Sequence, residues 1–513
     1  MSVRDRADIS PLAALVERAL DGPADRPAIE AHGRVVTMGE LARRVRALGA
    51  HLLDAAGGPG ERVAATMANG IAYVELYLAC FRTGLAVMPL HPDLPDATVR
   101  EASRAVRPAV VVHDGSGNRV ARAVAEARPQ RPAVLDARDL GDLPDPGPAP
   151  VPPPSPDSIA AVPLTSGTTG APKGVVVTHR NWAAGLEALD AAFGPLSQDD
   201  VLLHVTPLSH TTAQMIVPAL LAGAVQRILP AGDVAAAADL PASGKATRLF
   251  VFSAMLDDLA SAVAARGAAP RLRSVLYGGA PAPVPVIERA IDIMGPVLEQ
   301  GFGQTETFPP TLALRKGDHV LPGPEGRSIR SSIGRPVGTC EVRLVGEAGE
   351  GEVPGGTPGT IAVMGPNVTP GYFGDEAATA VARRGRFFLT GDVAVRDERG
   401  FFHLLGRAAD RIERRGAAIW PREIERTAEM HPGVLESAAC VVNGALTLAL
   451  VPRRGSAGPD LGAVWTFLAG RLRDREMPER LVWMAELPRN VNRKLVRDAL
   501  AAGLGAVADG RAP

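Results

Sequence analysis

A dense group of potential phosphate ligands lies in residues 164–179, which read LTSGTTGAPKGVVVTH. Glycines let backbone N–H groups approach a phosphate closely, hydroxyls add further donors, and a lysine adds a positive charge. The segment does not fit the GxxxxGK[ST] loop, because Lys173 follows a proline rather than a glycine. We therefore expect a phosphate-binding loop of another type. Its candidate ligands are Thr165, Ser166, Gly167, Thr168, Thr169, Gly170 and Lys173.

Five further short motifs follow this loop along the chain. They are YGGAP at 277–281, GFGQTE at 301–306, TGD at 390–392, a composite of GR at 406–407, DRI at 410–412 and IWPREIE at 419–425, and LPRNVNRK at 487–494. Taken singly, Asp392 has an ordinary explanation as a turn residue and Lys494 as a surface lysine. In this order, however, the six motifs resemble those of the adenylate-forming superfamily, in its acyl- and aryl-CoA synthetase branch.

The resemblance implies an α/β fold in two parts. Residues 1–407 would form a large N-terminal AMP-binding domain with two α/β subdomains and a β-barrel subdomain, as in acetyl-CoA synthetase-like proteins. Residues 408–513 would form a small, mobile α+β lid domain, hinged near Ala409 and Asp410.

Roles for individual residues also follow from the resemblance. Thr305 would hydrogen-bond the α-phosphate, and Glu306 would hold Mg²⁺, which prefers oxygen ligands. Phe302 would stack on adenine in place of the family's usual tyrosine. Asp392 would accept the two ribose hydroxyls, with Arg407 close to ribose and phosphate. Further implied nucleotide contacts are Gly279, Ala280, Pro281, Gly301 and Gly303.

The implied reaction has two halves. In the first, a carboxylate attacks the α-phosphate of ATP, and Lys494 stabilises the developing charge. In the second, the lid rotates, pantetheine enters a tunnel that includes Gly416, and the CoA thiol displaces AMP. The expected substrates are therefore ATP, a carboxylic acid and coenzyme A, with Mg²⁺ as cofactor.

The acyl group would lie near residues 206–213, which read TPLSHTTA and resemble the PLFH segment of acyl-CoA synthetases. The segment lacks the aspartate with which amino-acid-activating domains pair the substrate ammonium group. His210 would gate the pocket as a catalytic residue, with a structural histidine as the alternative. Ser209 replaces the usual aromatic residue. Small residues such as Ser209, Gly278 and Gly303 would leave room for a bulky or long acyl group.

The lid departs from the family pattern at several positions: Ala409, Glu413, the RRGAA stretch at 414–418, and Arg493. Arg493 stands where a glycine usually precedes the catalytic lysine, so it restricts the backbone there. These departures leave room for an enzyme specialised for the second half-reaction, taking a preformed acyl-adenylate. The motifs are also compatible with an acyl-AMP ligase that loads carrier-protein pantetheine and with a non-catalytic nucleotide-binding homologue.

Composition limits the remaining possibilities. With 46% hydrophobic and 22% charged residues the chain is globular, and its net charge of −1 gives no electrostatic reason to expect nucleic acid. Its three cysteines are far apart, which excludes a disulfide framework. We expect no membrane span and no secretory signal, and hence a cytoplasmic location. A homodimer is a further expectation, and the excess of arginine over lysine is typical of a GC-rich bacterium.

Patterns of apolar residues predict the elements that position the motifs. Helical spacing predicts helices at 11–20, 40–53, 421–429 and 461–473, and short apolar or alternating runs predict strands at 109–113, 201–206, 249–252, 274–276, 438–442 and 446–451. Glycine-rich turns between the runs 341–345 and 359–363 predict a small barrel or sheet. The turn at 397–400 predicts a hairpin. The proline-rich stretch 141–157 predicts a surface loop or an exposed linker.

Overall fold

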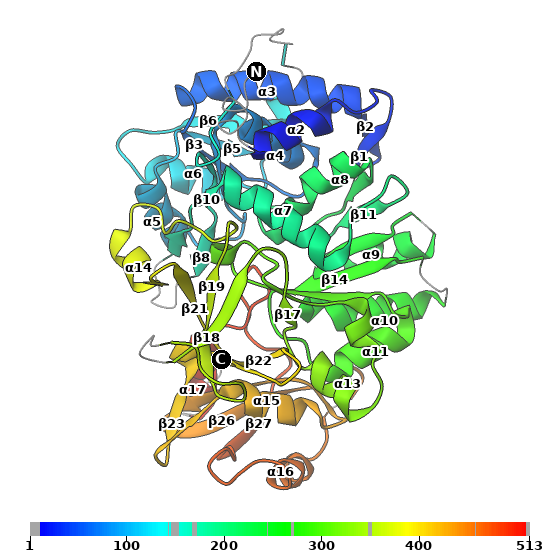
Figure 1. Ribbon diagram of the computed structural model, residues 1–513, viewed down its shortest axis with the longest axis vertical. Coiled ribbons are helices and arrows are strands. Elements are labelled where there is room, and N and C mark those ends of the chain that lie inside the picture. The colour runs from blue at the N-terminus through cyan, green and yellow to red at the C-terminus, as the bar shows by residue number, and fades with distance from the viewer. Residues whose placement is uncertain are drawn as a thin grey trace.

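The computed structural model describes residues 11–141, 143–144, 153–166, 172–243, 245–267, 271–346, 351–456 and 458–508. Most of the proline-rich stretch at 141–157 lies outside these residues. The first α/β sheet lies in the upper part of the molecule, the second α/β sheet reaches from there to middle height, an antiparallel sheet also lies at middle height, and an α+β unit lies at the bottom (Figure 1).

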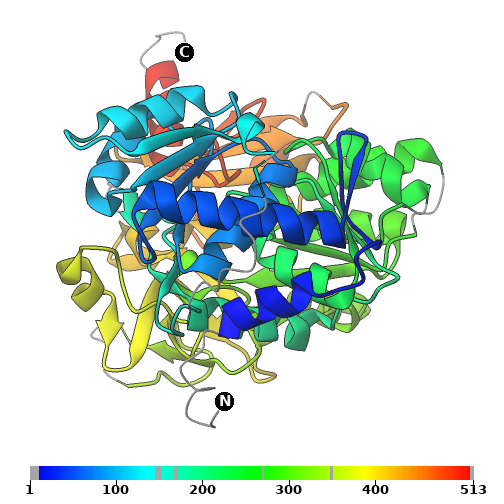
Figure 2. The same ribbon diagram turned by 90° about the horizontal axis from the view of Figure 1, so that it is seen from above.

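The first α/β sheet has six strands in the order β10-β7-β4-β3-β5-β6. Its strands are β3 (Arg62–Thr66), β4 (Ala86–Pro89), β5 (Val110–His113), β6 (Ala133–Asp136), β7 (Ile159–Ala161) and β10 (Val177–Thr178). Alternate residues face opposite sides, so that Val63 packs in a cluster with two helices, α3 (Met38–Ala56) and α4 (Ile71–Thr83), and Ala64 with two others, α5 (Asp96–Val106) and α6 (Asn118–Glu126). Helix α3 lies across the top of the molecule beside α2 (Pro11–Leu20) (Figure 2).

The second sheet has nine strands in the order β17-β16-β15-β14-β13-β11-β12-β1-β2. They are β1 (Pro27–Ala31), β2 (Arg34–Thr37), β11 (Val201–His204), β12 (Val225–Ile228), β13 (Arg248–Phe252), β14 (Ser274–Gly278), β15 (Leu298–Phe302), β16 (Leu312–Leu314) and β17 (Arg335–Pro336). Helices α9 (Val234–Ala242), α10 (Leu256–Arg266) and α11 (Val284–Met294) pack with β13 and β14 in one hydrophobic cluster. Helices α7 (His179–Phe193) and α8 (Ile216–Ala222) belong to the cluster of the first sheet. The centre of the sheet is parallel, as the alternation of strands and helices predicts.

A five-stranded antiparallel sheet follows, made of β18 (Glu341–Val345), β19 (Gly359–Met364), β20 (Arg383–Arg384), β21 (Phe387–Arg396) and β22 (Phe402–Arg407). The predicted hairpin is confirmed, since β21 pairs with β22 in antiparallel register. Its turn is stabilised by the Asp397 carboxylate, which accepts hydrogen bonds from the backbone N–H groups of Arg399 and Phe401 at 3.0 and 2.8 Å. A short helix, α14 (Glu376–Val381), flanks this sheet.

The last part of the chain has its own core. A three-stranded sheet of β25 (Val434–Val442), β26 (Ala445–Pro452) and β27 (Arg480–Trp483) packs against α15 (Pro421–Glu429), α16 (Leu461–Ala469) and α17 (Arg497–Ala508), with a small β-hairpin of β23 (Ile412–Arg414) and β24 (Ala417–Ile419) before them. The predicted helix 461–473 is wrong at its end, because Gly470, a poor helix former, ends α16 at Ala469.

This α+β unit contacts the second sheet's helices. Arg454 forms ion pairs with Asp257 and Asp258 of α10, and Leu435 packs against the cluster around β13 and β14. Among the described residues, no helix combines the length and the apolar character that crossing a membrane requires.

Candidate functional site

The carboxyl ends of β14 and β15 lie side by side and bring the YGGAP and GFGQTE motifs together. The two strands are parallel, with Gly278 opposite Gly301. A Cβ atom on Gly278 would lie 2.6 Å from the carbonyl oxygen of Gly301, so the glycine is required for this close approach. Loops at the carboxyl ends of such strands are the usual place for ligands. Beyond β14, Gly279 and Pro281 are exposed and Ala280 is half-buried.

The predicted phosphate loop begins and ends on a two-stranded hairpin of β8 (Leu164–Ser166) and β9 (Pro172–Gly174), in which Thr165 stands opposite Lys173. Gly167, Thr168, Thr169 and Gly170, together with the side chain of Ser166, lie outside the described residues. The Lys173 ammonium lies 5.1 Å from the centre of the Tyr372 ring, which is cation–π distance.

Tyr372 joins Lys173 to a second charged residue. Its hydroxyl donates to Glu306 Oε1 at 3.0 Å. Burial and the adjacent Glu306 carboxylate raise the pKa of Tyr372, so the phenol remains a donor. Glu306 belongs to a 3₁₀ turn, Thr305–Thr307, which carries both predicted phosphate-side residues. The sequence prediction missed Tyr372, which lies outside the motifs.

A second polar group surrounds Asp392. The carboxylate is buried and paired with Arg407 Nε at 3.0 Å across the β21–β22 ladder, where the two residues face each other. Gln304 Nε2 donates to Asp392 Oδ2 at 2.6 Å and to the Thr390 carbonyl at 2.9 Å. Burial raises the pKa of Asp392, while Arg407 and Gln304 lower it. Gln304 thus links the GFGQTE and TGD motifs, a role that the sequence analysis did not assign.

The residues around Glu306 fit a magnesium ion only in company with phosphate. The described residues contain no group of three or more His, Cys, Asp or Glu side chains placed to hold a metal ion. Mg²⁺ commonly keeps several waters and binds through one or two carboxylates plus substrate phosphates. One carboxylate at Glu306, next to the predicted phosphate loop, matches that pattern.

Lys494 belongs to the C-terminal unit and lies at the same cavity as Thr305. It lines a cavity of about 140 Å³ together with Thr305 and His210. Its loop is held by Asn490, whose side-chain Oδ1 accepts the backbone N–H of Lys494 at 3.1 Å and that of Asn492 at 3.0 Å. Burial and Arg407 lower the pKa of Lys494, whereas Asp392 and Glu306 raise it. Arg493 has φ of +57°, a left-handed conformation that favours glycine, in agreement with the restriction expected at this position.

The cavity lies where the two α/β sheets and the C-terminal unit meet. Its apolar wall includes Tyr77, Trp182, Phe193, Phe250, Leu276 and Phe308. Its polar wall includes Ser209, His210, Thr211 and Gln214, and Gly279, Gly301 and Gly303 also line it. Gly278, expected here, is not among the lining residues.

His210 is neutral in this wall. Burial, with smaller contributions from Lys494 and His91, lowers its pKa to about 3. Its Nδ1 lies 2.8 Å from the Thr211 hydroxyl, and its ring packs edge-on against Phe252 with centroids 5.6 Å apart. The structure places His210 at the cavity, and its role as a gate stays a prediction.

Residues expected at the hinge and the CoA tunnel lie outside this cavity. Ala409 and Asp410 form part of a 3₁₀ turn, Ala408–Asp410, and Gly416 lies exposed in the β23–β24 turn with φ of +72°. Glu413 pairs with Arg411 at 2.8 Å and does not line the cavity, so it does not repel a bound anion there.

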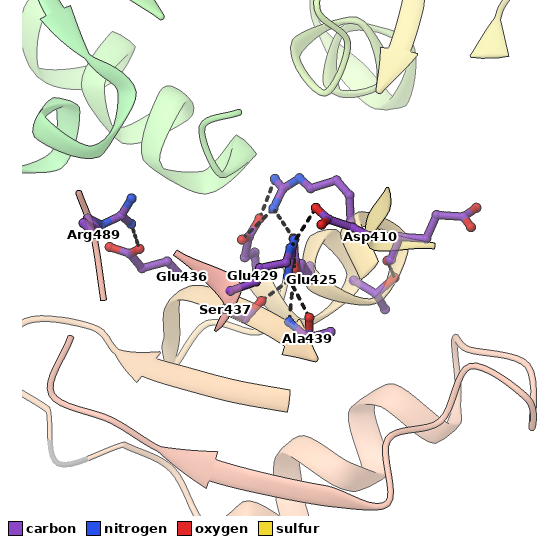
Figure 3. Close-up of polar contacts among 11 residues, drawn as sticks. Asp410, Glu425, Glu429, Glu436, Ser437, Ala439 and Arg489 are labelled. Atoms are coloured by element: carbon purple, nitrogen blue, oxygen red, sulfur yellow. Dashed lines mark hydrogen bonds and ion pairs between the residues drawn. The ribbon is translucent and has the colours of Figure 1, made fainter. Parts of the chain in front are cut away.

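An ion-pair network fastens Asp410 to the α+β unit. Arg497 pairs with Asp410 Oδ2 at 3.2 Å and with Glu425 Oε1 at 2.8 Å, and it donates to the Ala439 carbonyl at 2.6 Å. Glu425 also accepts the backbone N–H of Ala439 at 3.0 Å. Figure 3 shows Asp410, Glu425 and Ala439 gathered at this point between α15 and β25.

The chain matches the family model described as AMP-binding enzyme over residues 16–373, and it belongs to that family. It is 33% identical over 490 residues to a feruloyl-CoA synthase from an Amycolatopsis species, covering 92% of this chain and 94% of that protein. It is 30% identical over 498 residues to a 2-succinylbenzoate–CoA ligase from a Geobacillus species, covering 95% of this chain and 96% of that protein. Among solved structures it is similar to the amide bond synthetase McbA from Marinactinospora thermotolerans, with a TM-score of 0.87, 28% identity and coverage of 96% and 99%.

These comparisons bear out the predicted superfamily and its α/β fold. They also agree with the predicted activity of an adenylate-forming ligase that makes acyl-CoA. Neither the boundary at residue 407 nor the roles of individual site residues are tested by them.

Proposed function

We propose that this protein is an AMP-forming ligase that joins an aromatic carboxylic acid to coenzyme A, with ATP and Mg²⁺. The observation that carries the proposal is the position of Lys494. It lines one cavity with Thr305, where burial lowers its pKa and the nearby carboxylates of Asp392 and Glu306 oppose that lowering. The apolar lining of the cavity includes the aromatic rings of Tyr77, Trp182, Phe193, Phe250 and Phe308, against which a flat ring can stack.

In the first step, a carboxylate oxygen of the acid attacks the α-phosphorus of ATP. A P–O bond forms, the bond to the β-phosphate oxygen breaks, and pyrophosphate leaves. Lys494 would neutralise charge that develops on the carboxylate and the α-phosphate, which is the kind of preorganised electrostatic stabilisation that lowers a barrier most. Lys173 and Glu306, which Tyr372 joins, would bind on the phosphate side of this arrangement.

In the second step, the CoA thiolate attacks the acyl carbon, and AMP leaves with the electrons of the broken C–O bond. Lys494 lines the cavity, so the C-terminal unit would have to move before a thiol enters. We infer rotation near Ala409 and Asp410, with Gly416 on the path of pantetheine. Mg²⁺, when bound, would neutralise phosphate charge beside Glu306.

Several observations bear on the competing activities. The placement of Lys494 beside Thr305 suits the first half-reaction, so it does not favour an enzyme limited to the second. The two relatives described above are named as CoA enzymes, which favours CoA over a carrier protein. The solved neighbour is named an amide bond synthetase, which makes an amine acceptor the rival to exclude. A cytoplasmic location and a homodimer stay predictions.

The test is product analysis with purified protein, ATP, Mg²⁺ and a panel of benzoic, cinnamic and straight-chain fatty acids. Each acid is offered with CoA alone, with an amine alone, and with neither. We expect AMP, pyrophosphate and an aryl-CoA thioester with aromatic acids. An amide without thioester, or activity confined to fatty acids, would contradict the proposal.

A further inference from the structure

A glycine lies on the cavity-facing side of helix α7. Trp182, Leu189 and Phe193 of this helix line the cavity. Positions i, i+3, i+7 and i+11 share one face of an α-helix, so Gly185 belongs to the same face as these three residues. At Gly185 this face carries no side chain. A glycine inside a helix weakens it relative to alanine, so a packing reason is expected there.

The ring of Phe308 occupies the space beside Gly185. A Cβ atom on Gly185 would lie 2.1 Å from Phe308 Cδ1 and 2.6 Å from Cε1, which is too close for both to be present. Phe308 also lines the cavity. It therefore supplies the cavity wall at the place where α7 has no side chain of its own.

The Phe308 ring has no room to move away from the cavity along α7. Its centroid lies 4.8 Å from the ring of Trp182, and Trp182 in turn lies 4.6 Å from Phe81. Trp182 is 4% exposed and Phe81 is fully buried. Because the cavity is the open space next to this packed cluster, a group that pushed Phe308 off α7 would push it into the cavity.

The backbone also holds Phe308 in place. Its φ of +34° lies in the left-handed region, which is unusual for a bulky residue. The buried side chain of Asn367 fixes this conformation, since its Nδ2 donates to the carbonyls of Thr307 at 2.6 Å and of Phe308 at 3.3 Å. Backbone conformations of this kind persist where the surroundings impose them, and they are concentrated at ligand-binding sites.

We propose that Phe308, seated on Gly185, sets the size of the acid that the cavity accepts, so that acids with a single ring are preferred to biaryl acids. This inference rests on the proposed function. The cavity of about 140 Å³ is close in volume to the apolar cavity of about 150 Å³ that holds one benzene molecule in another protein. Removing the Phe308 ring would enlarge it, and adding a methyl group at Gly185 would reduce it.

The experiment measures kcat/KM for thioester formation with benzoic, cinnamic and biphenyl-4-carboxylic acids. For Gly185→Ala we expect the ratio of cinnamic to benzoic acid to fall by about 10-fold or more, because a mismatch of one methylene in an apolar pocket changes kcat/KM by about 10- to 200-fold. For Phe308→Ala we expect the ratio of biphenyl-4-carboxylic to benzoic acid to rise by a similar factor. Gly503→Ala is the matched control, since this helical glycine in α17 has open space at its Cβ position.

The double variant shows whether Gly185 acts through Phe308. Once the ring is removed, a methyl group at Gly185 has nothing to push into the cavity. We therefore expect Gly185→Ala to leave the ratios between acids unchanged in the Phe308→Ala background. If Gly185→Ala lowers the ratio of cinnamic to benzoic acid equally in both backgrounds, the pairing of Gly185 with Phe308 is wrong.

The outcomes separate this inference from the proposed function. If the wild-type protein makes no thioester from any aromatic acid, the proposed function fails. If it does, but both single variants change all three acids by the same factor, Phe308 and Gly185 have only a structural role and the inference alone is overturned. Phe308→Leu keeps an apolar side chain in the cluster, and it should shift the same ratio in the same direction where Phe308→Ala fails to fold.

Discussion

Tyr372 connects Lys173 and Glu306, two charged residues far apart in the sequence. Its ring lies under the lysine ammonium, and its hydroxyl donates to the carboxylate. The two charged residues could be predicted, because charge and oxygen ligands are needed at a phosphate. Tyr372 and Gln304 could not, because each acts through contacts with another motif that only the fold creates.

Replacing Tyr372 with phenylalanine keeps the ring beside Lys173 but removes the hydrogen bond to Glu306. We expect the apparent KM for Mg·ATP in pyrophosphate release to rise about 10-fold, since a hydrogen bond to a charged group contributes about 1.5 kcal/mol or more. Tyr372→Ala also loses the cation–π contact with Lys173, so its KM for Mg·ATP should be higher still. Titrations with magnesium and with ATP measure this KM. An unchanged KM in Tyr372→Phe would contradict the role that we assign to the Tyr372–Glu306 hydrogen bond.

At the scale of elements, the C-terminal unit is tied together by Arg497 at the start of α17. This one side chain meets Asp410 before β23, Glu425 of α15 and the backbone of β25. The sequence analysis predicted α15 and strands within β25 and β26, because their apolar spacing is regular. It did not predict this network, since nothing in local spacing shows which arginine meets which carboxylate.

Arg497→Ala would remove the nearer of the two arginines that pair with the buried Glu425, since Arg422 lies 3.7 Å away and Arg497 2.8 Å. We expect a loss of about 2–3 kcal/mol in stability, below the full value for a buried pair because Arg497 is partly exposed. We also expect slower pyrophosphate formation, because α17 directly follows the Lys494 loop. Denaturant unfolding measures the stability, and a pyrophosphate assay measures the rate of adenylation. Arg471→Ala, at an exposed arginine over the Phe467 ring, is the control and should change neither by much.

At the scale of the whole molecule, the presence of α/β sheets could be predicted from the sequence, but the order in which their strands pair could not. Alternating strand and helix signals indicated them, and the strand at 109–113 is found as β5. The sequence did not reveal that β1 and β2 join the second sheet beside β12. Such pairing depends on contacts between distant residues, which local patterns do not encode.

Several buried histidines make stability depend on pH across the whole molecule. Burial lowers the pKa of His179, His204 and His319 to about 4 and that of His210 to about 3. The unfolded chain binds their protons near pH 6.5 and the folded chain does not, so stability falls as pH drops below about 6.5. Between about pH 5 and 6, unfolding should take up three to four protons through these residues.

Chemical denaturation at several pH values measures this proton uptake. His204→Asn should reduce the slope of stability against pH by about one proton. His32→Gln, at an exposed histidine, should leave it unchanged. Stability that is flat between pH 5 and 6.5 would contradict the account.

The most direct test of the account measures the two half-reactions separately in Lys494→Ala, with Lys245→Ala at an exposed position as control. One assay follows pyrophosphate from ATP and an aromatic acid, and the other follows thioester from synthetic acyl-AMP and CoA. We predict that Lys494→Ala slows the first by about 10²- to 10³-fold and leaves the second nearly unchanged. Pyrophosphate release at the wild-type rate, or an equal loss of both halves in a folded protein, would contradict the proposal that Lys494 performs adenylation in this cavity.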